Sequence, residues 1–478
     1  MLRYTRRILT NDWGAWVPLV VVMSLTTALV GVCAHQFAWT HSSRFLAAVR
    51  IAGLRAEEFR IVSVSIYCCV ALIAAFSLTI IGAATVVRCA PDFRRWRLLG
   101  ATPTQVGATA CAMTAAASGI GAFAGSVFSV PASYVLIPWF NQLAAQSFPG
   151  GTGDFNPVFV PSPGALVASL ALSWLTCMLG AVGPVVRAAR MRPIEALRSS
   201  HAGADRVSGH PITAALVALF ALVLAIVGVS ASLPDETHRG GALSSLMLWP
   251  GVLLVAAVAL WGGRGVRVAI ACVGIIPALI GAPMGVLAGK ALRARAGRSA
   301  IIVTPLVSAV GGGSLLLCTI RTFERVIRIQ GVQENFNYTD TAVLVLLVSV
   351  FALATATAVT ALNAGDQGPE ITILRTLGVS RAHAWRMVVW QAALLAAATG
   401  LLALVLALAT AGIGLLLSLR LFAVSAFCPP VDLCAAFVLA SFLSVVSILR
   451  WRLAGWIGPW PALRGETCGN QVVARKGS

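Results

Sequence analysis

Charged side chains are scarce in this sequence, since aspartate, glutamate, lysine and arginine together make up 11% of its 478 residues. Lysine occurs only at Lys290 and Lys476, and acidic residues are essentially missing from the interior of the long apolar stretches. A proton-driven carrier needs carboxylates inside the membrane to relay protons. The sequence therefore disfavours that class of transporter, and the energy for any transport must come from elsewhere.

The motifs of common enzyme classes are missing as well. The nearest approach to a phosphate-binding loop is 285–291, which has too few residues between its glycines and no hydroxyl after Lys290. The sequence contains no nucleophile elbow, no HExxH helix, no CxxC pair and no histidine cluster. We therefore expect no enzymatic activity, no cofactor and no metal in this chain.

Hydrophobic residues are abundant by contrast, at 58% of the chain, and the mean hydropathy is +0.88. This composition predicts an all-α polytopic membrane protein. The apolar runs long enough to cross a bilayer fall into groups of four, two and four. These ten candidate spans are 13–34, 61–87, 106–137, 164–186, 212–233, 243–261, 301–320, 341–362, 384–417 and 431–449.

The net charge of +19 would suggest a nucleic-acid partner in a soluble protein, but in a membrane protein its distribution predicts orientation. Of the 35 lysine and arginine residues, 26 fall in the N-terminal tail and in every second connection. We predict that these connections and both termini are cytoplasmic, and we expect no nucleic acid. The first apolar run lacks a small-residue cleavage site, which favours a retained span over a signal peptide.

One short phrase occurs twice. Residues 91–102 read PDFRRWRLLGAT and residues 369–380 read PEITILRTLGVS, and the two align without a gap. Each copy opens with proline and an acid, which favour a helix start, and carries a glycine that favours a helix end. Thr102 and Ser380 can then cap the helix that follows, which is the third span of its group.

The repeat extends beyond this phrase, because the segments that close the two groups of four share P-x-x-A-L-R at Pro193 and Pro459. We expect two four-span units in the same orientation, since each begins and ends on the same side. The predicted domains are a first unit (1–200), a linker with two spans and an interfacial segment (201–288), a second unit (289–466) and a cytoplasmic tail (467–478).

The stretch 266–288 admits two interpretations. It is apolar enough to span, but a span would place four basic residues outside, and Pro277 and Pro283 interrupt the pattern. We prefer a segment that lies in or dips into the cytoplasmic face. Cys428 and Cys434 also leave two possibilities: they flank a predicted outer turn and can pair, although six-residue separations near a membrane are common by chance.

Two further patterns concern packing and the outer connections. Runs of small residues at 118–126 and 309–317 favour close helix contact over hinges. The outer connections 35–60 and 321–340 are too short for a folded domain. The second carries charges at helical spacing, which predicts a helix that extends past the membrane, at Arg321, Glu324, Arg325 and Arg328.

The phrases RRWRLLGATPTQV and ILRTLGVSRAHA, together with the closing AARMRPIEALR, resemble segments of the FtsX-like (MacB-type) permeases of ABC transporters. The resemblance covers roughly 1–198 and 285–465. It implies a duplicated ten-span permease of the bacterial plasma membrane that works with a separate cytoplasmic ATPase. That partner is expected in two copies for each permease chain and carries the ATP and magnesium, while membrane lipids surround the spans.

By this resemblance, the two phrases are coupling helices that dock on the ATPase. A short helix with an apolar stripe offers anchors to a partner groove, which agrees with that role. The alternative is a surface helix whose arginines bind anionic lipid headgroups. The residues assigned to docking are Asp92, Phe93, Arg94, Trp96, Arg97, Leu99 and Gly100 in the first copy, and Glu370, Ile371, Leu374, Arg375, Leu377 and Gly378 in the second.

Two functional hypotheses follow from the resemblance and the apolar spans. In the first, the chain couples ATP hydrolysis by its partner to export or extraction of an amphipathic, peptide or lipid-like substrate. In the second, it is a transmitter of the FtsX type that passes the motion of the ATPase to an extracytoplasmic partner without moving a substrate. The short outer connections slightly disfavour the second hypothesis.

Overall fold

The computed structural model shows a chain built from long helices. All regular elements in the described part are helical, which confirms the all-α class, and seven of the described helices are long and apolar enough to cross a membrane. The structure describes residues 13–53, 100–146, 155, 157–189, 211–230, 239–294, 296–329 and 380–456, together with scattered residues between 70 and 97 and at 353 and 357.

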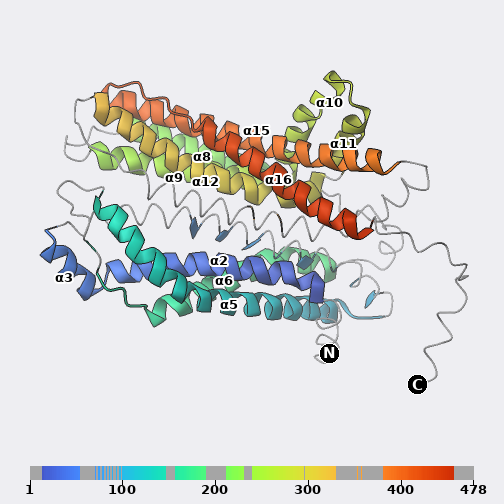
Figure 1. The fold of residues 1–478 in the computed structure, drawn as a ribbon, viewed down its shortest axis with the longest axis horizontal. Coiled ribbons are helices and arrows are strands. Elements are labelled where there is room, and N and C mark those ends of the chain that lie inside the picture. Colours follow the sequence, from blue (N-terminus) through green and yellow to red (C-terminus); the bar gives the residue numbers. More distant parts are fainter. Residues whose placement is uncertain are drawn as a thin grey trace, which may run out of the picture.

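The helices form two bundles, one above the other in Figure 1. In the first bundle, α5 packs against both α2 and α6, and α3 follows the C-terminal end of α2. These elements correspond to three of the four spans predicted for the first unit, while 61–87 lies largely outside the described residues. Their bounds are α2 (Trp13–Thr40), α3 (Ser43–Ile51), α5 (Pro103–Gln146) and α6 (Pro163–Ala189).

In the second bundle, α15 packs against both α12 and α16. The two helices between the repeats, α8 and α9, pack on each other and on this second bundle, because α9 lies along α12 and α15. The span predicted at 341–362 lies largely outside the described residues. The bounds are α8 (Pro211–Ser230), α9 (Arg239–Val273), α12 (Ala296–Ile329), α15 (Arg381–Phe422) and α16 (Val431–Trp456).

Glycines let the helices of the first bundle approach closely. A Cβ atom at Gly121 would lie 2.5 Å from the Cβ of Met23, and one at Gly125 would overlap the carbonyl oxygen of Ser24. In the second bundle, a Cβ at Gly311 would lie 2.8 Å from a methyl group of Leu406. The small-residue runs therefore serve helix packing, as the sequence predicts.

The stretch 266–288 does not form a span of its own. Helix α9 bends at Gly262, where φ is +51°, and continues to Val273. The chain then reverses through α10 (Ile276–Leu279) and α11 (Pro283–Ala294), which packs against α15. Figure 1 shows this hairpin standing out from the side of the second bundle. The place of this hairpin at the cytoplasmic face stays a prediction.

One end of the second bundle carries the charges predicted for the outer connection. Helix α12 continues to Ile329 as one element, so the charged stretch from Arg321 to Arg328 is helical as predicted. Arg321 forms a two-pronged ion pair with Asp432 of α16, with N–O distances of 2.9 and 2.6 Å. Cys428 and Cys434 both carry free thiols, and Cys434 lies 3.7 Å from the hydroxyl of Ser314.

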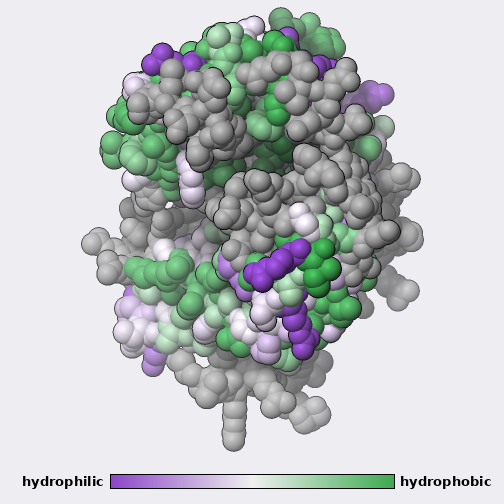
Figure 2. Space-filling model, turned by 90° about the vertical axis from the view of Figure 1, so that its left-hand side faces the viewer, coloured by the Kyte–Doolittle hydropathy of each residue, from purple (hydrophilic) through white to green (hydrophobic). Residues whose placement is uncertain are grey.

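The sides of the bundles are apolar. Large hydrophobic side chains such as Leu172, Leu179 and Leu216 are exposed along them. Figure 2, which looks onto the end where α3 lies, shows hydrophobic side chains on the flanks of both bundles. A surface of this kind suits lipid chains better than water, which agrees with a membrane location.

Candidate docking site

The first copy of the repeated phrase ends in a well-defined helix stop. Gly100 has a φ of +92°, which L side chains rarely adopt. The N–H of Ala101 donates to the carbonyl of Trp96 (2.9 Å), and the N–H of Gly100 donates to the carbonyl of Arg97 (3.2 Å). These two hydrogen bonds form a Schellman motif, so the short helix ends at the predicted glycine.

Helix α5 begins immediately after this stop. The N–H of Thr102 donates to the Gln105 side-chain oxygen (3.0 Å), and the N–H of Gln105 donates to the Thr102 hydroxyl (3.3 Å). This reciprocal pair is a capping box. The guanidinium of Arg97 also donates to the carbonyl of Ala101 (2.8 Å). The short helix and α5 are therefore joined by a tightly hydrogen-bonded turn. We call the capped start of each of the two long helices an elbow: the first lies at Thr102, before α5, and the second at Ser380, before α15.

The second copy caps its long helix in a related way. The hydroxyl of Ser380 accepts the N–H of His383 (3.5 Å), and its oxygen lies 2.6 Å from Nδ1 of the His383 ring. His383 and Gln105 occupy matching positions in the repeat, so each elbow uses a side chain three residues beyond the cap. Both predicted caps are confirmed. All six residues assigned to docking in this copy lie outside the described residues: Glu370, Ile371, Leu374, Arg375, Leu377 and Gly378.

The two elbows lie at the same end of the molecule. Figure 1 shows that α5 and α15 both begin at its right-hand end. They are the longest helices that the structure describes, at 44 and 42 residues. A partner that pushed on both elbows would therefore act on the starting ends of two long helices at once.

Part of the predicted apolar stripe faces the protein itself. Phe93 is 2% exposed and packs with Val106 and Ala110 of α5 and Ala181 of α6. Trp96 is partly buried, and its ring lies edge-to-face with that of Phe93, at 5.4 Å between centroids. Phe93 therefore anchors the short helix to its own bundle and is closed to a partner in this conformation, whereas part of Trp96 remains exposed.

The sequence could not reveal this inward contact, because an apolar residue at every third position looks the same whichever surface it meets. Three of the residues assigned to docking in the first copy, Asp92, Arg94 and Leu99, lie outside the described residues. Gln105 was not singled out from the sequence, although the spacing T-x-x-Q before an apolar run is the known signature of a capping box.

We expect Thr102→Ala to loosen the first elbow. The substitution removes the hydroxyl that accepts the N–H of Gln105, and loss of an N-cap typically costs about 1 kcal/mol. The thermal midpoint of the purified chain should fall slightly, and Thr102→Ser, which keeps the hydroxyl, should restore it. Equal midpoints for the alanine and serine variants would show that the cap contributes nothing.

Comparison with known proteins finds one family model that matches this chain in two separate regions. A family model described as FtsX-like permease C-terminal matches residues 64–193 and 341–451, which together make up just over half of the chain. Each matched region contains one copy of the repeated phrase and the elbow that follows it. No curated protein and no solved structure shows a significant match to the chain.

Proposed function

This chain belongs to the FtsX-like permease family, whose members are permease-type membrane components of ABC transporters, and we propose that it couples ATP hydrolysis by a separate cytoplasmic ATPase to movement of an amphipathic or lipid-like substrate. In this proposal both elbows are docking points, so that two ATPase subunits bind one chain. The chain itself carries no catalytic role, and both of its termini are cytoplasmic, in the plasma membrane of a bacterium.

The pair of capped elbows is the observation that carries this proposal. A force applied to a flexible linker would be lost in the linker, whereas the hydrogen bonds at Gly100 and Thr102 join the short helix directly to α5. Helix α5 is long enough to carry a displacement over about 66 Å, from one side of a bilayer to the other.

The contact between α5 and α2 lets that displacement spread. The two helices meet at Gly121 and Gly125, where the backbone of α2 lies directly against α5. Closely packed helices of this kind move together, because there is no layer of flexible side chains to absorb a shift. Movement of the first elbow would therefore reposition the core of the first bundle.

The charges of the described spans favour an apolar substrate. The only acidic residues within the described helices are Glu324 and Asp432, and both are engaged in ion pairs near the outer end of the second bundle. A carboxylate relay or a binding site for small cations would need acidic groups deeper in the bundles. An amphipathic or lipid-like molecule does not.

Reconstitution with an ABC ATPase that co-purifies with this chain tests the proposal. We expect ATP-dependent movement of a fluorescent single-chain glycolipid, an alkyl glucoside, between the leaflets of proteoliposomes, and its loss when the catalytic glutamate of the ATPase is replaced by glutamine. Movement that persists with the inactive ATPase would overturn the proposal. ATP turnover that depends on this chain but never moves the lipid would favour the transmitter hypothesis instead.

A further inference from the structure

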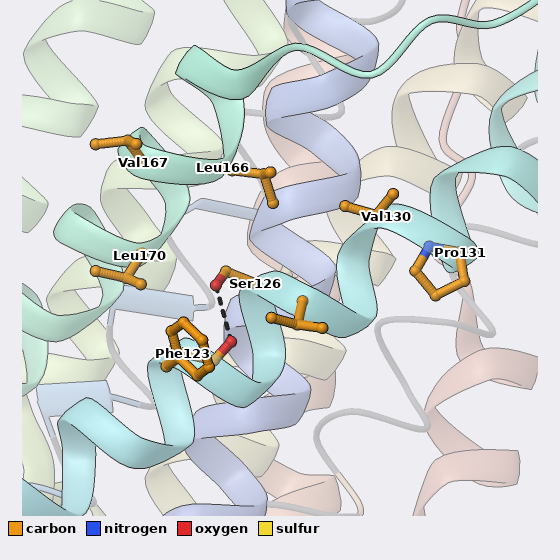
Figure 3. Close-up of a pocket in the computed structure, with 8 residues that line it drawn as sticks. Phe123, Ser126, Val130, Pro131, Leu166, Val167 and Leu170 are labelled. Atoms are coloured by element: carbon orange, nitrogen blue, oxygen red, sulfur yellow. Dashed lines mark hydrogen bonds between the residues drawn. The ribbon is translucent and has the colours of Figure 1, made fainter.

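An apolar groove opens between α5 and α6 on the side of the first bundle (Figure 3). Its volume is about 580 Å³. Helix α5 contributes Phe123, Val127 and Pro131, and the first turns of α6 contribute Leu166 and Leu170. Val127 is 54% exposed, so the groove is open along the flank that would face lipid.

The groove suits a hydrocarbon chain better than a peptide. Ser126 is the only lining residue with a polar side chain, and its hydroxyl donates to the carbonyl of Phe123 at 2.9 Å, as Figure 3 shows. A peptide backbone placed here would leave its N–H and C=O groups without partners, which costs free energy. A hydrocarbon chain has no such groups to satisfy.

A cluster of buried polar side chains lies farther along the same bundle, toward its outer end. His35, Gln36 and Trp39 of α2 and Asn141 of α5 are between 1% and 4% exposed. Gln36 donates to the side-chain oxygen of Asn141 at 2.7 Å, and the backbone N–H of Ser162 donates to Nδ1 of His35 at 3.3 Å. Four polar atoms of this cluster have no hydrogen-bond partner among the described residues: His35 Nε2, Gln36 Oε1, Trp39 Nε1 and Asn141 Nδ2.

The chemistry of these four atoms defines the group that would satisfy them. Because Nδ1 of His35 accepts a hydrogen bond, the neutral ring carries its proton on Nε2, which makes that atom a donor. Trp39 Nε1 and Asn141 Nδ2 are donors as well, and Gln36 Oε1 is an acceptor. Three donors and one acceptor, none of them charged, match an uncharged head that is rich in oxygen, such as one carrying hydroxyl groups.

Phe159 connects the groove to the polar cluster. It lies on the extended segment before α6, is 4% exposed, and its ring centroid is 5.3 Å from that of Tyr134. Tyr134 follows Pro131 on α5 by about one turn and so marks the outer end of the groove. On its other side, Phe159 meets His35 at 6.1 Å and Trp39 at 5.8 Å between ring centroids.

We propose that the groove and the polar cluster form one binding site for a single-chain amphiphile with an uncharged, oxygen-rich head. The chain lies between α5 and α6, and the head receives hydrogen bonds from His35, Trp39 and Asn141 once Phe159 moves aside. This names a substrate class for the proposed function and rests on that function only for the link to transport. Binding itself needs no ATPase.

Photolabelling of the purified full-length chain in nanodiscs tests the groove, which would hold the hydrocarbon chain of the ligand. The probe is an alkyl glucoside with a diazirine in its chain, added without ATPase. We expect saturable labelling of the α5 and α6 peptides that line the groove, and Val127→Trp, which fills the groove, should lower it by about fivefold or more. Val182→Trp is the matched control, because Val182 is 53% exposed on α6 outside the groove.

Labelling of the Val127→Trp variant at the wild-type level, or labelling that excess bilayer lipid removes completely, would overturn the groove as a specific site. If Val127→Trp does not give folded protein, Leu170→Trp fills the groove from the α6 wall and takes its place. Only variants that elute as the wild type does from a sizing column are compared.

The polar cluster, which would bind the head of the ligand, is tested separately with the double variant Gln36→Leu and Asn141→Leu. We expect labelling by the alkyl glucoside to fall by about fivefold or more, while a diazirine alkane without a head labels as before. The thermal midpoint should hold or rise, because unpaired buried polar groups are removed. A lower midpoint with unchanged glucoside labelling would assign the cluster a structural role and overturn the proposal.

An alkyl phosphate carrying the same diazirine chain completes the design. Weaker labelling by this anionic probe supports an uncharged head, and equal labelling contradicts it. Because every measurement omits the ATPase, the site and the proposed function can fail separately. Loss of ATP-driven movement with labelling intact would remove the function and leave the site, whereas the reverse result would remove the site alone.

Discussion

Aspartate at both Leu99 and Leu377 is expected to abolish co-purification of the ATPase with this chain. The two leucines hold matching positions in the repeated phrase. A carboxylate placed in an apolar contact loses its water and gains no partner. We expect the recovered ATPase to fall by about tenfold or more, measured by affinity purification of the chain from membranes that contain both proteins.

The control places the same charge beside each elbow without touching the apolar stripe. Thr104 and Ala382 also hold matching positions, and both are exposed in the first turns of α5 and α15. Aspartate is favoured there by the helix dipole, so Thr104→Asp with Ala382→Asp should retain the ATPase. Retention of the ATPase by the double leucine variant, or purification of the wild-type chain alone, would reduce the repeated phrases to an architectural role.

Phe93 should behave differently from Leu99, because it packs inside the bundle. Its contacts with Val106 and Ala110 of α5 would be lost in Phe93→Ala, and such truncations cost about 3–5 kcal/mol in protein cores. The variant should therefore lose stability before it loses docking. This contrast separates the stabilising contact of Phe93 from the docking role proposed for Leu99.

Gly125→Ala is expected to overpack the contact between α5 and α2 severely. The new Cβ would overlap the carbonyl oxygen of Ser24 and lie 2.7 Å from the Cβ of Thr27. Backbone atoms of α2 cannot rotate away, so the two helices must separate along their contact. Overpacking of this kind costs about 1–3 kcal/mol or more, and we expect a clear fall in thermal midpoint and in folded yield.

Gly119→Ala is the matched control for this change. Gly119 lies in the same helix, but a Cβ there would meet its nearest neighbour, Nε1 of Trp174, at 3.6 Å, which is an ordinary contact. Since alanine favours a helix more than glycine by about 1 kcal/mol, this variant should match or exceed the stability of the wild type. Equal stability of the two alanine variants would contradict the close approach of α2 and α5.

The sequence by itself determined the features that depend on composition or on neighbours within a few residues. The scarcity of charge and the long apolar runs identified an all-α membrane protein. The helix stop at Gly100 and the caps at Thr102 and Ser380 were predictable because each uses hydrogen bonds that close within five residues. The helical conformation of the charged residues from Arg321 to Arg328 was predictable from their spacing alone.

The tertiary structure decided what depends on contacts between distant parts of the chain. Only packing shows that Phe93 faces inward, that the chain bends at Gly262 and reverses into α11, and that the linker helices lie on the second bundle. The hydrogen bond between Gln36 and Asn141 joins residues 105 positions apart. Such pairings depend on how whole helices stack, and apolar spans with similar composition can stack in many ways, so local sequence patterns do not distinguish among them.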